Sequence, residues 1–318
     1  MSKGKVFKYI KYLIFIVTIF TLIYYFNKEL TYFISNKINV NYYFIFYSIL
    51  ILLLTYFIQA GVWYLITFFS KCNINFKDTI LLYLYLNGAK YFPGKLLPYI
   101  ILFNFYSKED KNIARITLSI TIEHLISALS SILMLCLGSS GLLVHFFDLP
   151  AKVLYLFLTF LMILFISLLH PVLLNLLNKK ICKLLKKEFV YIQIEYKSLF
   201  YIFTLECLRF VFLTIAHLLF FSAFFPIHFE SFMTIMFMIS ISNFISYLFF
   251  FLPAGIGSRE AVYIVGLGML IPKRIASMAS LTSRLWITFS DMLIIVLAFF
   301  IDITGRRFVY KRVLGNSK

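Results

Sequence analysis

Charged residues are scarce in this sequence, and their scarcity excludes an ordinary soluble domain. They make up 14% of the 318 residues, whereas soluble domains carry about a quarter. Hydrophobic residues make up 62%, and the mean hydropathy is +0.93. Apolar runs of about twenty residues recur from end to end, and each is long enough to cross a bilayer. We therefore expect an all-α, polytopic transmembrane helical bundle that forms a single integral membrane domain over residues 1–318.

Signatures of enzymes and of metal sites are also missing. The sequence contains no H-E-x-x-H, Walker A or G-x-S-x-G motif, and Gly255-Ile256-Gly257 lacks the rest of a dinucleotide fingerprint. The four cysteines form no C-x-x-C pair and are expected to be reduced packing residues. We therefore expect no catalytic residue, no cofactor and no metal.

Positive charge is in excess, with a formal net charge of +17. The basic residues gather at the ends of the apolar segments, and no soluble basic module could carry a nucleic-acid site. The excess is instead typical of cytoplasmic loops and of attraction to anionic lipid headgroups. Nucleic acid is not an expected partner.

Loop charge indicates how the chain crosses the membrane. Apolar segments lie at about 9–26, 42–69, 78–106, 113–137, 151–177, 198–223, 230–270 and 276–302. If residues 78–106 crossed fully, the lysine-rich loop near residues 179–187 would come out on the wrong side of the membrane. We therefore expect about six full spans plus two re-entrant hairpins, near 78–106 and 230–270, with eight spans as the alternative. The termini are expected in the cytoplasm and the protein in the cell membrane.

The first expected hairpin turns at a proline between two lysines. Pro93 removes a helical hydrogen bond and Gly94 permits a sharp bend. Arms of about eleven residues reach only ~17 Å as helix, which is roughly mid-bilayer. Non-helical backbone at that depth must lie inside protein or beside water. Lys90 and Lys95 could bind a lipid phosphate there, or could extend to a nearby interface.

The second expected hairpin has the same design. Pro253 precedes Gly255 and Gly257, and Arg259 and Glu260 follow. The planar fork of an arginine suits a phosphate diester, so Arg259 is a candidate phosphate ligand. Glu260 is expected to cap the short helix that follows or to pair internally.

The two hairpins suggest an inverted repeat. About thirty residues after each proline, an ionisable residue lies within the next span: Glu123 after the first and Arg284 after the second. If both hairpins are re-entrant, they open to opposite faces of the membrane.

The remaining intramembrane charges need partners. Glu123 is expected to neutralise Lys90 or Lys95, or to titrate during transport, and His124 beside it is expected to be a packing histidine. Arg284 and Asp291 lie seven residues apart on nearly one helical face and are expected to pair.

A second pair, Glu206 and Arg209, lies three residues apart and is expected to lock helices together. Asn243 could bridge helices or line a path through the protein.

Two motifs carry a family resemblance. "NGAKYFPGK" (residues 87–95) and "PAGIGSREA" (residues 253–261) resemble the two motifs of the lysylphosphatidylglycerol synthase transmembrane-region family. Ala254 and Ser258 depart mildly from that family's pattern. The resemblance implies a lipid-handling role, since the bundle of two-domain members flips an aminoacylated phospholipid made by a soluble C-terminal transferase. The chain ends at Lys318 directly after its last span, so aminoacyl transfer itself is not expected.

These observations predict a flippase-like lipid translocase or a lipid-binding membrane protein. Its substrate would be an anionic phospholipid or a polyprenyl-phosphate-linked lipid, and a glycosyltransferase or lipid-modifying enzyme is a possible partner. The alternatives are a membrane-embedded glycosyl- or phosphotransferase and a non-transporting scaffold. The predicted substrate-binding residues are Lys90, Pro93, Gly94, Lys95, Glu123, Gly255, Gly257, Arg259, Glu260, Arg284 and Asp291.

Overall fold

A computed structural model describes the chain over residues 40–90, 97–109, 111–138, 151–184, 191, 194–248, 257–305 and 309. This part of the chain is helical and contains no strand, which confirms the predicted all-α bundle. The first predicted span, residues 9–26, lies outside the described residues, as do Pro93, Gly94, Lys95 and Gly255.

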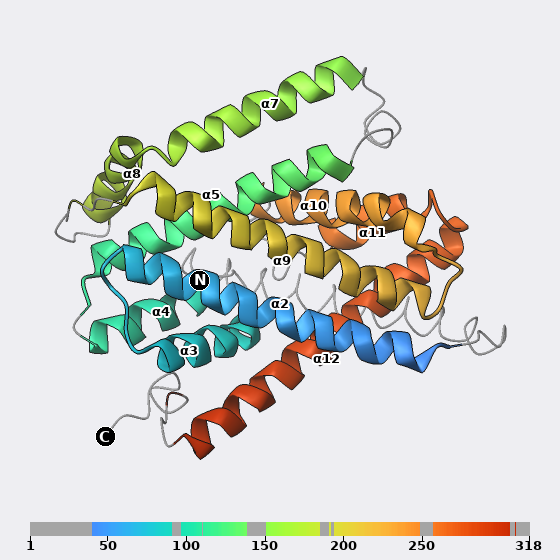
Figure 1. Cartoon of the computed structure of the whole chain (residues 1–318), viewed down its shortest axis with the longest axis horizontal. Helices are drawn as coiled ribbons and strands as arrows, with labels where there is room; N and C mark the ends of the chain where they lie inside the picture. Colours follow the sequence, from blue (N-terminus) through green and yellow to red (C-terminus); the bar gives the residue numbers. More distant parts are fainter. Residues whose placement is uncertain are drawn as a thin grey trace, which may run out of the picture.

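Long apolar helices form the bundle (Figure 1). Within the described residues, five helical segments are long and apolar enough to cross a membrane. They are α2 (Tyr42–Phe69), α5 (Ile113–Gly138), α9 (Tyr196–Ser222), α12 (Lys273–Thr304) and the segment Phe229–Ser246, which comprises the 3₁₀ turn η1 (Phe229–Ser231) and most of α10 (Phe232–Leu248). The helices α7 (Ala151–Leu168) and α8 (Pro171–Leu184) meet at a bend of 69° and could together form a sixth span.

Both segments that contain a predicted hairpin are divided into separate helices. In the first, α3 (Phe76–Ala89) and α4 (Leu97–Lys108) have 14 and 12 residues. Helices of this length extend only about 18–21 Å, which is too short to cross ~30 Å of hydrocarbon. In the second, α10 is followed by the 10-residue helix α11 (Ser258–Leu267). The helix breaks were predicted at these places; the re-entrant path remains a prediction.

Helix starts are fixed by side chains that satisfy backbone N–H groups. Asn41 accepts from the N–H of Phe44 at the start of α2, and Asn75 accepts from that of Lys77 at the start of α3. Within the helices, serine and threonine hydroxyls donate to the carbonyl of the preceding turn, as Thr214 does to Phe210. The hydroxyls that do so therefore sit in apolar helices without losing their hydrogen bonds.

The helices pack in a connected set (Figure 1). The blue helix α2 runs alongside the yellow helix α9, and α10 packs against α5 and α11. The red helix α12 crosses the bundle in contact with α11 and α3, whereas α7 lies at the outer side of α5. The largest apolar cluster joins α9, α10 and α11 through Phe210, Phe221, Phe237 and Tyr263.

Polarity is arranged as expected for a bundle surrounded by lipid. On α12, the side chains of Phe289 and Met292 are 56% and 62% exposed, whereas Asp291 between them is 1% exposed. The outer surface of this helix is thus apolar while its carboxylate points inward. Membrane helices show this pattern because intramembrane charge faces the protein interior or a polar cavity.

The buried cysteines behave as packing residues, as predicted. Cys72 and Cys182 are almost fully buried. In the turn that follows α2, burial raises the pKa of the Cys72 thiol to about 11, so the thiol is protonated at neutral pH.

The close contact between α5 and α10 requires a glycine and gives a stability test. A Cβ at Gly138 would lie 2.9 Å from the backbone oxygen of Met233 and 2.9 Å from the backbone nitrogen of Phe237. Gly138→Ala should therefore lower the free energy of unfolding by about 1–3 kcal/mol, because backbone must move to admit the methyl group.

Gly61 in α2 is the matched control, since a Cβ there meets nothing within 4 Å. Gly61→Ala should leave stability unchanged or raise it by about 0.5–1 kcal/mol through helix propensity. Thermal melting in detergent measures both variants, and equal melting temperatures would contradict the packing of α5 on α10.

Candidate functional site

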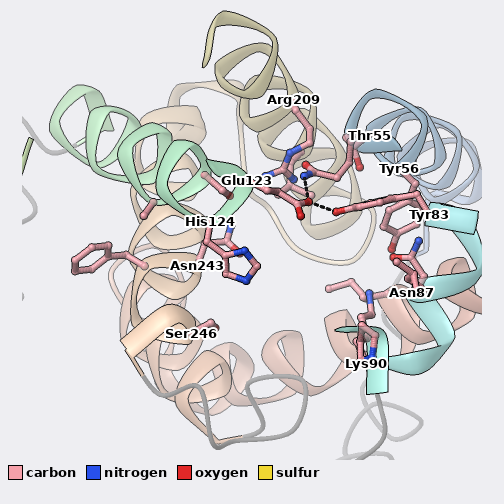
Figure 2. Close-up of a pocket in the computed structure, with 18 of the residues that line it drawn as sticks. Thr55, Tyr56, Tyr83, Asn87, Lys90, Glu123, His124, Arg209, Asn243 and Ser246 are labelled. Carbon is pink, nitrogen blue, oxygen red and sulfur yellow. Dashed lines mark hydrogen bonds between the residues drawn. The ribbon is translucent and has the colours of Figure 1, made fainter. Parts of the chain in front are cut away.

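A cavity of about 700 Å³ lies among the helices, and residues from both ends of the described chain line it. Its lining is partly apolar and partly polar. Figure 2 shows Asn87 and Lys90 across the opening from Asn243 and Ser246. Asn243, for which the sequence allowed two roles, therefore lines the cavity. Small-molecule sites in proteins have about this volume, ~300–1,000 Å³.

Arg259, predicted as a phosphate ligand, lines this cavity from the first turn of α11. Its Nη2 donates to the Tyr263 hydroxyl at 2.8 Å and to Nε2 of His217 at 3.2 Å. The guanidinium also lies 5.0 Å from the centroid of the Tyr263 ring. Arg259 makes no ion pair with any carboxylate in the described part of the chain, and its buried Nε–H has no hydrogen-bond partner there.

The geometry fixes His217 in a neutral form. A guanidinium can only donate, so Nε2 of His217 is the acceptor, and the hydroxyl of Tyr263 lies 3.1 Å from the same nitrogen. Its Nδ1 lies 2.8 Å from the backbone oxygen of Leu213 and therefore carries the proton. The indole of Trp286 packs edge-on against the imidazole, with centroids 5.0 Å apart. Both groups that hold Arg259 are thus neutral.

Glu123 lines the same cavity from α5. Its Oε1 accepts from the Tyr83 hydroxyl and from Nε2 of Gln59, which lies 3.2 Å away (Figure 2). Oε2 makes no hydrogen bond to a residue in the described ranges. The expected pairing of Glu123 with Lys90 is wrong, because Lys90 reaches a different carboxylate; its pairing with Lys95 lies outside the described residues.

Lys90 pairs with Asp291 instead, at 2.8 Å between Nζ and Oδ1. The carboxylate is almost fully buried on α12, whereas the side chain of Lys90, beside the end of α3, is 34% exposed and lines the cavity. The prediction that Asp291 pairs with Arg284 is therefore wrong. Two residues seven apart share a helical face but are separated by about 10 Å along the axis, so distant helices supply nearer partners.

Glu260 has both of the roles that the sequence suggested. Its Oε2 accepts from the N–H of Gly257 at 2.7 Å, which caps α11, and its Oε1 accepts from Nε of Arg284. Gly257 has a φ of +89°, a backbone conformation that favours glycine. Glu260 is therefore occupied in joining α11 to α12 and does not pair with its neighbour Arg259.

Arg209 and Glu206 form the predicted pair on α9, with Nη2 and Oε1 2.6 Å apart. Arg209 also lines the cavity. Because both residues of the pair lie on α9, the expected locking of helices stays a prediction. His124 is hydrogen-bonded as expected, through Nδ1 to the backbone oxygen of Ile120 and through Nε2 to the Tyr99 hydroxyl, and it lines the cavity as well.

The structure thus brings three predicted residues, Lys90, Glu123 and Arg259, to one cavity. Glu260, Arg284 and Asp291 do not line the cavity. Asp291 pairs with Lys90, which lines it, and Glu260 pairs with Arg284. Sequence reasoning missed His217, although a histidine within an apolar segment is itself a signal of an interior polar site. Tyr83 and Gln59 gave no signal, because nothing in the sequence distinguishes them from other polar residues of membrane helices.

Comparison with known proteins assigns neither a family nor a function to this chain. No family model, curated protein or solved structure matches this chain. The motif resemblance to the lysylphosphatidylglycerol synthase transmembrane region therefore stays a prediction.

The Lys90–Asp291 pair gives an asymmetric stability prediction. Lys90→Met should lower the free energy of unfolding by about 2–4 kcal/mol, because it removes the cation that pairs with the buried carboxylate of Asp291. Asp291→Asn should lower the free energy of unfolding by a smaller amount. Lys90 is partly exposed to solvent, and the amide oxygen of the new asparagine can still accept a hydrogen bond from Lys90.

The double variant Lys90→Met/Asp291→Asn should recover most of the loss. Denaturant titrations in micelles provide the double-mutant cycle. Strictly additive losses would contradict a direct ion pair between these residues.

Proposed function

We propose that the protein is a lipid translocase, or a lipid-binding membrane protein, that holds a phosphate-bearing headgroup in the cavity. The supporting observation is Arg259, which lines the cavity and has no carboxylate partner among the described residues. An arginine in a membrane bundle is costly unless a counter-charge or polar surroundings compensate it. A ligand anion would provide that compensation.

A phosphate fits the groups available. A guanidinium has five N–H donors, and two neutral acceptors engage only Nη2 of Arg259, which leaves its Nη1 donors for a ligand. Arg259 also lies in the first turn of α11, where the helix dipole favours an anion. The arginine and the helix terminus would therefore act on the same anionic group.

A lipid is favoured over a soluble phosphate compound by the surroundings of the cavity. The helices that line it have apolar outer faces, so a headgroup could occupy the cavity while its acyl or prenyl chains stay in the bilayer. An anionic phospholipid and a polyprenyl-phosphate-linked lipid both match this arrangement. The motif resemblance points to the same lipid-handling role, with a lipid-modifying enzyme or glycosyltransferase as partner.

The expected orientation places the protein as a multi-pass component of the cytoplasmic membrane with both termini in the cytoplasm. The sequence shows no nucleotide-binding motif, so a gradient or the consumption of the lipid on one side would drive net transport.

Transport can be measured in liposomes that contain acyl-labelled fluorescent phospholipid or polyprenyl-phosphate lipid. The protein should accelerate lipid movement between leaflets, and Arg259→Gln should lower the rate by about tenfold or more, because it removes a charged hydrogen-bonding group.

Arg274→Gln is the control, since it makes the same chemical change at an exposed position outside the cavity. It should transport like the unmodified protein. Absence of acceleration over protein-free liposomes for every headgroup would refute transport, and an unchanged rate in Arg259→Gln would refute the site.

A further inference from the structure

Two of the charged side chains that line the described cavity already form ion pairs. Lys90 is neutralised by Asp291 and Arg209 by Glu206, so two of the three cations that line the described cavity already have a partner. These pairs leave no excess positive charge at their positions. A charged ligand would therefore pair with those ionisable side chains of the lining that form no ion pair within the described chain.

Two such groups line the described cavity, and they have opposite signs. Arg259 is held only by the neutral groups of His217 and Tyr263. Glu123 is held only by the neutral donors of Tyr83 and Gln59, both at Oε1. Neither of the two forms an ion pair with a residue of the described chain, including each other.

A ligand with one negative charge would compensate Arg259 and leave Glu123 as it is. A ligand that carries both a negative and a positive charge would compensate both groups, and each buried charge that gains a partner reduces the cost of desolvation. The cavity is therefore complementary to a ligand of zero net charge with its two charges separated.

We infer that the headgroup bound in this cavity is zwitterionic, with its phosphate at Arg259 and a primary ammonium at Glu123. This inference rests on the proposed function and specifies its substrate class as an aminophospholipid of the ethanolamine type. It narrows the anionic lipid expected from the sequence, because that expectation assigned the carboxylate of Glu123 to a lysine, whereas Lys90 pairs with Asp291.

The polar groups near Glu123 favour a primary amine over a quaternary one. An ammonium has three N–H donors, and Oε2 of Glu123 is an acceptor that no described residue uses. The side-chain oxygens of Asn87 and Asn243 belong to the same lining. A choline headgroup has no N–H to donate, so it could satisfy only the electrostatic part of this site.

Native mass spectrometry of the whole protein can test the inference. The protein is incubated in micelles with an equimolar mixture of phosphatidylethanolamine, phosphatidylcholine and phosphatidylglycerol that share the same acyl chains. The ethanolamine lipid should be retained about tenfold over each of the other two, as expected for one additional charge-assisted hydrogen bond.

Variants assign the preference to Glu123. Glu123→Gln should abolish the preference for ethanolamine while retaining an oxygen that accepts from Tyr83, whereas Glu123→Asp, which restores the charge, should recover part of it. Glu195→Gln, the same change at an exposed position before α9, should keep the full preference. Arg259→Gln should lower the retention of all three lipids.

The outcomes separate this inference from the proposed function. Equal retention of the three lipids, a preference for phosphatidylglycerol, or an unchanged preference in Glu123→Gln would overturn the zwitterionic headgroup while leaving a phosphate-lipid site in place. Retention of none of the three by a protein with an unchanged melting temperature would overturn both.

Discussion

The cost of a buried charge in an apolar bundle is the constraint on which this structure depends. Three carboxylates inside the described bundle form ion pairs with basic side chains, and two of these pairs join different helices. The pair between Lys90 and Asp291 connects the end of α3 to α12, and that between Glu260 and Arg284 connects α11 to α12. These contacts hold the short helices against the long ones, because breaking them would leave an unpaired ion where water is scarce. The cavity is the place where this compensation is incomplete.

Features governed by local geometry could be predicted from the sequence. Composition indicated the all-α membrane bundle, and prolines and glycines indicated where two helices are interrupted. The pair between Glu206 and Arg209 follows from the three-residue spacing of a helix, and the capping role of Glu260 follows from its position three residues after Gly257. Each of these predictions needs only the conformation of one helix.

Long-range pairing could not be predicted in the same way. The sequence supplies a set of cations and anions, but their partners depend on how the helices cross. The expected pairs of Asp291 with Arg284 and of Glu123 with Lys90 were wrong for this reason. Arg259 was predicted as a site residue from its own chemistry, and it lines the cavity. The neutral residues that position it, His217 and Tyr263, become identifiable only when α9 and α11 are placed side by side.

The central claim is that a polar, water-accessible cavity lies inside a bundle whose outer surface is apolar. Single cysteines, introduced after replacement of Cys72, Cys136, Cys182 and Cys207, test it in intact membranes. Ser246 lines the cavity, whereas Met292 is 62% exposed on the outer face of α12. The account predicts that a water-soluble cationic thiol reagent modifies Ser246→Cys and leaves Met292→Cys unmodified. Modification of Met292→Cys with protection of Ser246→Cys would contradict it.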